Sequence, residues 1–443
     1  MTLQDDLGMP LSGATPDALD DYRTALRRFQ CFAGDPVAPI EAAIAAAPGF
    51  VMAHALRAYL YLLGTEPEGL AVARAGLKAA RGLPMTGRER GHLAAIEHLI
   101  AGRWRDGARA LEDVALDAPR DILALQAGHA ADFFRGDSRM LRDRIARALP
   151  AWDPAMPGYH ALLGMRAFGL EEMGHYAEAE IAGRKAVEME PRDGWAQHAV
   201  AHVMEMQGRT GDGIAWMRAA PEVWSAESAL AVHNWWHLAL YHLDMGEIDE
   251  VLALYDAKIF APRSKLALEM IDASAMLWRL MLRGVDVGDR WQPLADDWAP
   301  HAGTGFYAFN DFHAAMAFVG AGRPALIEEL FAAQEAALGR GGDNAAFTRE
   351  VGGDACRAVV AFGAGDDREV IRLLRPLRHL AARFGGSHAQ RDLIDLTLLE
   401  AALRAGEANL AQGLAAERLA LKPASPAARA LVSRAAGRAL KAA

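Results

Sequence analysis

The sequence predicts an all-α protein, a right-handed superhelical solenoid of about ten helical hairpins. Its 443 residues exceed the roughly 250 to 300 residues that one hydrophobic core usually serves, so we expect several domains or an elongated repeat array. Hydrophobic residues make up 52% of the chain but aromatic residues only 7%. This difference reflects heavy use of Ala and Leu, which are strong helix formers.

One segment has the complete spacing of a known helical repeat. Residues 160–191 read HALLGMRAFGLEEMGHYAEAEIAGRKAVEMEP, with marker residues at Gly174, Tyr176, Ala179, Ala186 and Pro191. Small residues let two antiparallel helices pack closely, and Pro ends the second helix. The spacing is typical of a tetratricopeptide repeat, so we expect a tetratricopeptide-repeat-like solenoid.

The turn glycine of this segment recurs along the chain at intervals of 34 to 43 residues. The series is Gly64, Gly102, Gly136, Gly174, Gly208, Gly246, Gly284, Gly322, Gly365 and Gly406. An apolar helix pattern precedes nearly every member. The alternative, a set of unrelated helical hairpins, would not keep so constant a period.

The chain divides by pattern into four expected segments. Residues 1–48 form an N-terminal cap, with a polar leader, a helix near Pro16–Phe32 and another over Pro39–Ala47. Acidic residues gather at the start of the first helix, where the helix dipole favours them. Residues 49–156 hold the N-terminal repeats.

Residues 157–256 hold the central repeats, and residues 257–443 hold the C-terminal repeats with a capping helix. Seven of the fifteen histidines lie between His160 and His242. We expect Gly284 to Gly305 to be a long loop folded over the array. Ser387 is expected to cap a helix that starts at His388.

Composition excludes several classes of function. A net charge of −10 and a pI near 5.9 argue against a nucleic-acid partner, which requires a basic surface. Cys31 and Cys356 are too few for a disulfide framework, which favours a reducing cytoplasm. The N-terminus is acidic where a signal peptide is basic, and no apolar run is long enough to span a membrane. We therefore expect a cytoplasmic protein with no membrane partner; the sequence leaves homodimerisation open.

A polar stripe marks the segment from Trp195 to Asp244. On one helix Trp195, His198, His202 and Glu205 fall within an arc of roughly 80°. The next helix repeats the motif with His233, Asn234, Trp236 and His237. An ordinary core face would be Leu, Ala and Val, so the stripe is either a polar groove or a buried polar network.

Two histidine pairs with i,i+4 spacing lie on these neighbouring helices. Together His198, His202, His233 and His237 could present four imidazoles, ligands suited to a divalent transition metal such as Zn²⁺. No HExxH motif is present. The alternative is a set of histidines that are hydrogen-bonded in a polar groove or in the core.

Four blocks of the sequence resemble the tetratricopeptide repeat protein 38 family. They are HAVAHVMEMQGR, VHNWWHLALYHLDMGEIDEVLALYD, DASAMLWRL and GGSHAQRD, and the resemblance extends over essentially the whole chain. It implies a solenoid of helical hairpins without implying an activity. By the register of such repeats, the concave groove would receive Trp195, His198, His202, Glu205, His233 and Trp236, with His237 at its border.

Two functions follow from this groove. The first is a binding module for a small polar molecule or a peptide terminus, with Trp walls and polar side chains that fix orientation. The second is an enzyme that uses His198, His202, Glu205, His233 and His237 in acid–base or metal-assisted chemistry, hydrolysis in particular. The expected ligand-binding residues are His160, Trp195, His198, His202, Glu205, His233, Asn234, Trp236, His237, Asp272, Asn310, His313, His388, Arg391 and Asp392. For Asp272, a structural salt bridge near Arg279 is the alternative.

Overall fold

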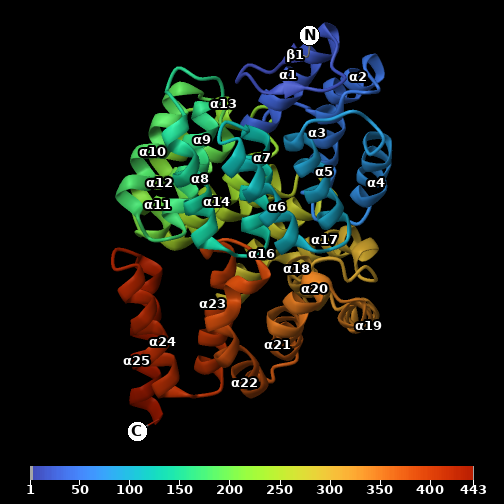
Figure 1. Ribbon diagram of the computed structural model, residues 1–443. Helices are drawn as coiled ribbons and strands as arrows, with labels where there is room; N and C mark the ends of the chain where they lie inside the picture. Colours follow the sequence, from blue (N-terminus) through green and yellow to red (C-terminus); the bar gives the residue numbers. More distant parts are fainter. Residues whose placement is uncertain (1–2, 443) are drawn as a thin grey trace. The chain divides into compact units, whose positions relative to one another are not determined.

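The computed structural model describes residues 3–442, with side chains through residue 437. Helices α1 to α25 follow one another along the chain (Figure 1). Among the described residues the strands are β1 (Leu3–Gln4) and β2 (Pro10–Leu11), which pair antiparallel. The expectation of an all-α fold is confirmed.

The N-terminal leader departs from the expectation because it forms this short β-ribbon. Asp5 accepts hydrogen bonds from the backbone N–H groups of Leu7 and Met9 at 2.9 and 2.8 Å. Gly8 supplies the positive φ of the turn, +78°. Local side-chain bonds of this kind stabilise a turn that has no helical period.

By its internal contacts the chain separates into two compact units. The first unit comprises Met1–Val200 and Ala220–Ala231, and the second comprises Ala201–Ala219 and Val232–Ala443. The segment 220–231 belongs to the first unit because backbone hydrogen bonds join it to the N-terminal cap, from Gly34 to Glu227 (2.7 Å) and from Ala229 to Phe32 (2.8 Å). The four segments expected from the sequence stay a prediction.

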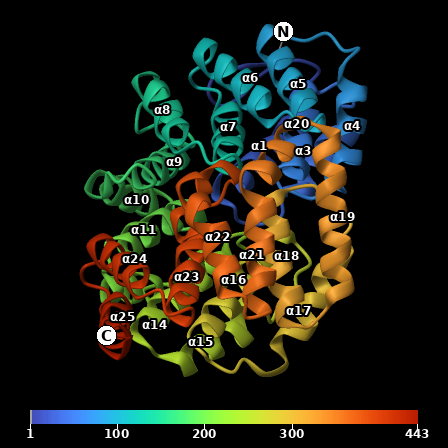
Figure 2. The same cartoon turned by 90° about the horizontal axis from the view of Figure 1, so that it is seen from below.

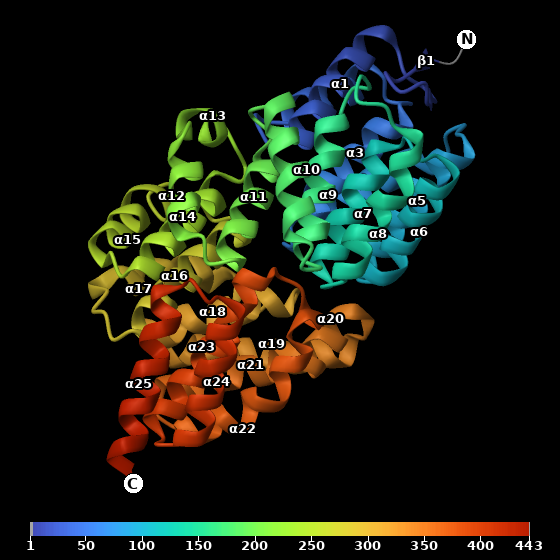
Figure 3. The ribbon, with the colours of Figure 1, turned by 90° about the vertical axis from the view of Figure 1, so that its left-hand side faces the viewer.

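The first unit is a row of helical hairpins in which consecutive helices pack together (Figure 3). The first helix begins at Pro16, as expected, and Thr15 caps it. The helices are α1 (Pro16–Cys31), α2 (Val37–Ala46), α3 (Val51–Leu62), α4 (Gly69–Ala80), α5 (Gly87–Ile100), α6 (Trp104–Asp117), α7 (Ile122–Phe134), α8 (Ser138–Ala148), α9 (Tyr159–Glu171), α10 (Tyr176–Met189) and the short α13 (Pro221–Ser225).

The second unit begins within α11 (Gly194–Met206), a continuous helix whose first residues belong to the first unit. Ser387 caps α23 through a capping box with Gln390, as expected. Helices α16, α18, α21 and α23 are neighbours (Figure 2). The other bounds are α12 (Thr210–Arg218), α14 (Ala231–Met245), α15 (Ile248–Leu254), α16 (Ala267–Leu282), α17 (Trp291–Trp298), α18 (Ala308–Gly320), α19 (Pro324–Arg340), α20 (Gly342–Phe347), α21 (Gly353–Gly363), α22 (Asp367–Leu377), α23 (His388–Arg404), α24 (Ala408–Leu421) and α25 (Pro426–Ala442).

The predicted turn glycines lie between helices, and nearly all are left-handed. From Gly102 to Gly406 each has a positive φ between +65° and +80°. Glycine adopts this conformation without the steric cost of a Cβ. Gly64 is the exception, since the left-handed residue of its turn is Thr65 (φ +60°). The predicted hairpin register is therefore confirmed, with a one-residue shift in the first turn.

The connection from Gly284 to Gly305 is not the expected loop. It contains helix α17, which packs against both α16 and α18 and so forms the second helix of a hairpin. Trp291 and Trp298 are buried, and the Trp298 indole donates to Ser274 Oγ at 2.9 Å. Pro293 lies in the first turn of the helix, where proline is tolerated.

None of the described helices is both long enough and apolar enough to cross a lipid bilayer.

Candidate functional site

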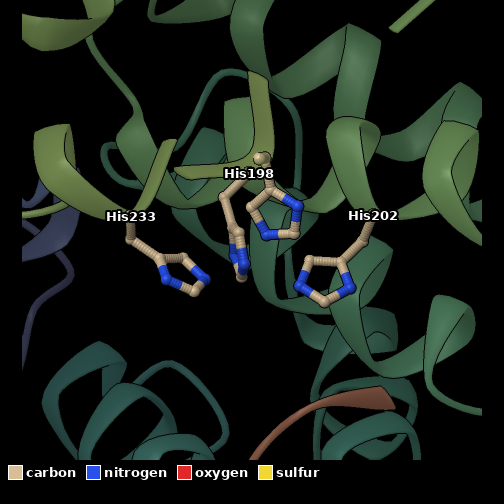
Figure 4. Close-up of side chains that lie close together, drawn as sticks. His198, His202 and His233 are labelled. Carbon is tan, nitrogen blue, oxygen red and sulfur yellow. The ribbon is translucent and has the colours of Figure 1, made fainter. Parts of the chain in front are cut away.

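Helices α11 and α14 bring four imidazoles together. The ring centroids of His202 and His237 are 4.4 Å apart, and those of His233 and His237 are 4.9 Å apart. His198 lies one turn before His202 on the same helix. One nitrogen from each of these four rings lies within 4.8 Å of the others, and the labelled rings point toward a common space (Figure 4). We call His198, His202, His233 and His237 the histidine cluster.

Carboxylates from two helices orient two of these rings. His233 Nδ1 is 2.9 Å from both carboxylate oxygens of Asp272 on α16, whose side chain is 1% exposed. Because an ionised carboxylate only accepts hydrogen bonds, Nδ1 is the nitrogen that donates to Asp272. Glu205 on α11 lies 3.5 Å from Nδ1 of His237. Such carboxylate–imidazole pairs fix both the tautomer and the direction of the ring.

Burial affects the pKa of two imidazoles of the cluster. It lowers the pKa of His202 well below the ordinary value, and positive charge on His237 and His233 would lower it further. Burial also lowers the pKa of His237, although Glu205 opposes this effect. For Glu205, burial raises the pKa, but Lys422 and His237 outweigh it and hold the pKa well below its usual range. At neutral pH His202 and His237 are therefore neutral, and Glu205 is ionised.

The two tryptophans expected in the groove have different surroundings. Trp236 is fully buried and stacks on His233 at 5.3 Å, with its ring edge-on to His237 at 5.0 Å. Trp195 contacts His198 at 4.9 Å, and its ring also packs in the first unit against Phe168 at 4.7 Å. Trp236 therefore forms a wall of the cluster, whereas Trp195 belongs mainly to an aromatic core.

His160, which we expected among the ligand-binding residues, lies in the first unit on α9. Its Nδ1 is 2.8 Å from Asp193, the residue that precedes α11. A second link of the same kind joins His92 Nε2 to Asp121 at 3.0 Å. Each link joins one hairpin to the start of the next.

Predicted residues from the C-terminal repeats lie in the second unit. His388 is close enough to His202 for its charge to lower the pKa of that imidazole. His313 is buried, and its Nδ1 donates to the carbonyl of Phe309 at 2.8 Å. Burial lowers the pKa of His313 to about 3. Asn234 and Asn310 are also buried.

The expected salt bridge near Arg279 is not formed by Asp272. Asp272 bonds to His233 instead. The Arg279 guanidinium donates to the carbonyls of Ala275 and Ala389 at 3.3 and 2.5 Å and lies over the Trp236 ring at 5.2 Å. Asp272 and Arg279 share a face of α16, but they lie two turns apart and therefore meet different partners.

A cavity of about 250 Å³ lies in the second unit beside Glu205. Helices α14, α16, α23, α24 and α25 and the turn after α11 line it. Three ion pairs line the cavity: Lys422–Glu205 (2.9 Å), Arg418–Asp392 (2.6 and 2.7 Å) and Arg434–Glu400 (2.6 and 3.0 Å). These bonds use Glu205 and Asp392, which were expected to bind a ligand.

Among the described residues, two further arginines of the wall form hydrogen bonds only to carbonyls. They are Arg279 on α16 and Arg283, which caps the end of that helix one turn later. Arg283 donates to the carbonyl of Leu243 at 2.6 Å. Asp244 in the same wall accepts from the hydroxyls of Ser425 and Thr210. The charged cavity residues that the sequence analysis did not assign to a site are Arg279, Arg283, Glu400, Arg418, Lys422 and Arg434. The i,i+4 spacing of Arg279 with Arg283, and of Arg418 with Lys422, was the available signal.

Arg391, another expected ligand residue, donates to the carbonyl of Gly386 in the turn before α23. It is largely buried. This bond holds the start of α23, next to His388.

No protein-family model matches the chain. Among solved structures, one similar chain belongs to the complex described as Naa15/Naa10 bound to HypK-THB. The two chains are 12% identical, and the match covers 96% of this chain and 66% of that chain, with a TM-score of 0.25. This protein thus spans about two thirds of the length of the matched chain.

Proposed function

We propose that this protein is a tetratricopeptide-repeat-like binding module of the tetratricopeptide repeat protein 38 family. The four sequence blocks support the family, and α11, α14, α16 and α23 carry them. Its ligand is a small molecule with a carboxylate or phosphate group, which binds in the cavity of the second unit. The observation that carries this proposal is the environment of Arg279.

Arg279 is a buried cation without an anionic contact. Its side chain is among the buried residues, at 4% exposure, and no carboxylate of the described residues lies within ion-pair distance of it or of Arg283. Burial lowers the pKa of Arg279 to about 10, so it is still charged at neutral pH. Buried charges are normally paired because their desolvation is costly. An anionic ligand group would supply the missing partner with charge-assisted hydrogen bonds.

The size of the cavity supports a small ligand. Its volume of about 250 Å³ is below the roughly 300 to 1,000 Å³ of pockets for drug-sized molecules. Apolar side chains such as Leu240, Leu282 and Leu399 form part of the wall. A compact molecule with one anionic end and an apolar or neutral remainder suits this lining. The free carboxylate of a peptide offers the same chemistry and is an outcome of the test.

Calorimetry with defined probes tests the proposal. Succinate, inorganic phosphate and a tripeptide, with either a free or an amidated C-terminus, are titrated into the protein. Arg283→Gln should lower the affinity for the anionic probe that binds most tightly at least tenfold. The matched control is Arg290→Gln, since Arg290 pairs with Asp256 outside the cavity. Absence of binding for every probe, or an equal loss in both variants, would contradict the proposal.

The enzyme alternative rests on a different observation, the histidine cluster. Glu205 belongs to both sites, because it lines the cavity and lies beside His237. The low pKa of His202 makes this imidazole a weak base at neutral pH, and an efficient general base has a pKa near the working pH. Simple acid–base catalysis by His202 is therefore disfavoured. The alternative depends on a metal, and conversion of a bound probe by the metal-loaded protein would support it.

A further inference from the structure

We propose that His202, His233 and His237, with His198 as a fourth donor, bind one divalent transition-metal ion, and that Zn²⁺ fits the site. The proposal concerns a second site, and it does not depend on anion binding in the cavity. It rests on the convergence of the imidazoles and on the carboxylates behind them.

The distances are close to those of a metal site. Zn²⁺ bonds to imidazole nitrogen at about 2.0–2.1 Å, so tetrahedral ligand atoms lie roughly 3.4 Å apart. The four nitrogens lie within 4.8 Å of one another. Even the widest separation would close if each of its two rings moved by about 0.7 Å, within the reach of small side-chain rotations. The helices would need no rearrangement.

The surroundings also resemble those of a ligating histidine. Asp272 accepts from Nδ1 of His233, and Glu205 lies beside Nδ1 of His237. In both rings Nε2 is the nitrogen opposite the carboxylate. Metal-bound histidines usually donate their other ring N–H to a carboxylate or carbonyl, which orients the ring and increases its basicity. Asp272 and Glu205 are thus positioning residues.

Other histidines of the same chain show what a purely structural role looks like. His92 and His160 each bond to one aspartate, Asp121 and Asp193 respectively. In the described residues no further histidine joins either pair in a group of potential metal ligands. In the histidine cluster, by contrast, rings from two helices converge. A hydrogen-bonding link between hairpins needs one imidazole and does not explain four.

Imidazole ligands favour a divalent transition metal that is intermediate between hard and soft ions. Imidazole nitrogen suits Zn²⁺, Cu²⁺, Ni²⁺ and Fe²⁺, whereas Mg²⁺ and Ca²⁺ prefer oxygen. No cysteine belongs to the group. Co²⁺ is a useful probe because its visible spectrum reports a tetrahedral nitrogen site.

The test uses full-length protein that carries no polyhistidine tag and has been freed of metal with a chelator. Zn²⁺ binding is measured by competition with a chromophoric chelator, and bound metal is counted by elemental analysis. We expect one Zn²⁺ per chain. His202→Ala and His233→Ala should each weaken binding at least a hundredfold, and Asp272→Asn should weaken it 10- to 100-fold. His160→Ala is the matched control and should leave binding unchanged.

Two results would overturn the proposal. One is wild-type protein that binds no Zn²⁺ or Co²⁺ at micromolar concentrations. The other is a folded His202→Ala variant with unchanged affinity. Circular dichroism checks folding, and if His202→Ala fails to fold, His202→Gln takes its place with the same criterion. The cavity titration is run on metal-free protein, so a failed anion proposal and a failed metal proposal give different results.

Discussion

Lys422 joins the C-terminal repeats to α11 through a buried ion pair with Glu205. Lys422→Met keeps the length of the side chain but removes its charge. The two side chains are 13% and 11% exposed, and their charged atoms are 2.9 Å apart. Removal of one partner from a fully buried pair costs about 3–5 kcal/mol, because the other charge is left without compensation. Since both side chains keep some solvent contact, we expect a loss of about 3 kcal/mol in the free energy of unfolding.

Urea denaturation followed by circular dichroism measures this loss. The control is Lys185→Met, because Lys185 pairs with Glu188 at the same 2.9 Å but with side chains that are 53% and 70% exposed. An exposed pair of this kind contributes roughly 0–1 kcal/mol. In a double-mutant cycle, Lys422→Met and Glu205→Gln should be non-additive by about 1–3 kcal/mol.

The contribution of the Glu205–Lys422 pair to stability should depend on pH. The pKa of Glu205 is lower in the folded protein than its ordinary value of 4.5. Its contribution to stability is therefore complete above about pH 4.5 and is lost as the pH falls toward the folded pKa. Lys422→Met should reduce this acid-side loss. Equal effects of Lys422→Met and Lys185→Met at pH 7 would refute the reasoning.

Three further predictions concern packing, turns and burial. Leu238 is fully buried, so Leu238→Ala should lower the free energy of unfolding by roughly 2–5 kcal/mol in urea titrations; a change below about 1 kcal/mol would contradict its core position. Gly246 has φ +80°, whereas Gly64 has no positive φ, and a Cβ there would make only ordinary contacts with Glu66 and Tyr61, at 3.6 and 3.7 Å. Gly246→Ala should therefore lower the free energy of unfolding by about 1–2 kcal/mol, and Gly64→Ala should lower it less. The reverse order in the same urea titration would be evidence against the turn geometry. Burial raises the pKa of Asp311 from 3.8 to about 7, so its ionisation destabilises the fold as the pH rises from about 4 to 7. Asp311→Asn should then stabilise the protein at pH 8 by as much as about 4 kcal/mol and much less at pH 4. Equal effects at both pH values would count against this.

The repeat pattern predicted most of the fold because its signals are local. A positive φ at Gly174 or Gly246 requires only the residues of one turn, and the turn glycines recur at similar intervals along the sequence. Helix α17 was not predicted because the sequence around it contains several Gly, Pro and Trp residues, which are weak helix signals. Its two buried tryptophans stabilise it by tertiary packing, which outweighs weak local propensity.

The histidine cluster could be predicted for a similar reason. His198 and His202 share a helix face, and the repeat register places His233 beside them. The wall of the cavity could not be predicted in this way. Lys422 and Glu205 are 217 positions apart in the sequence, and helical periodicity does not state which distant repeats meet. The partners of Glu205 and Asp392 therefore appear only in the folded chain.

Anomalous X-ray diffraction from crystals grown with one equivalent of Zn²⁺ tests the central claim most directly. Data on either side of the zinc absorption edge locate the ion without reference to any assay. The account predicts one strong peak about 2.0–2.1 Å from a nitrogen of each of His202, His233 and His237. A peak at other residues, or none in this cluster at full zinc loading, would contradict it.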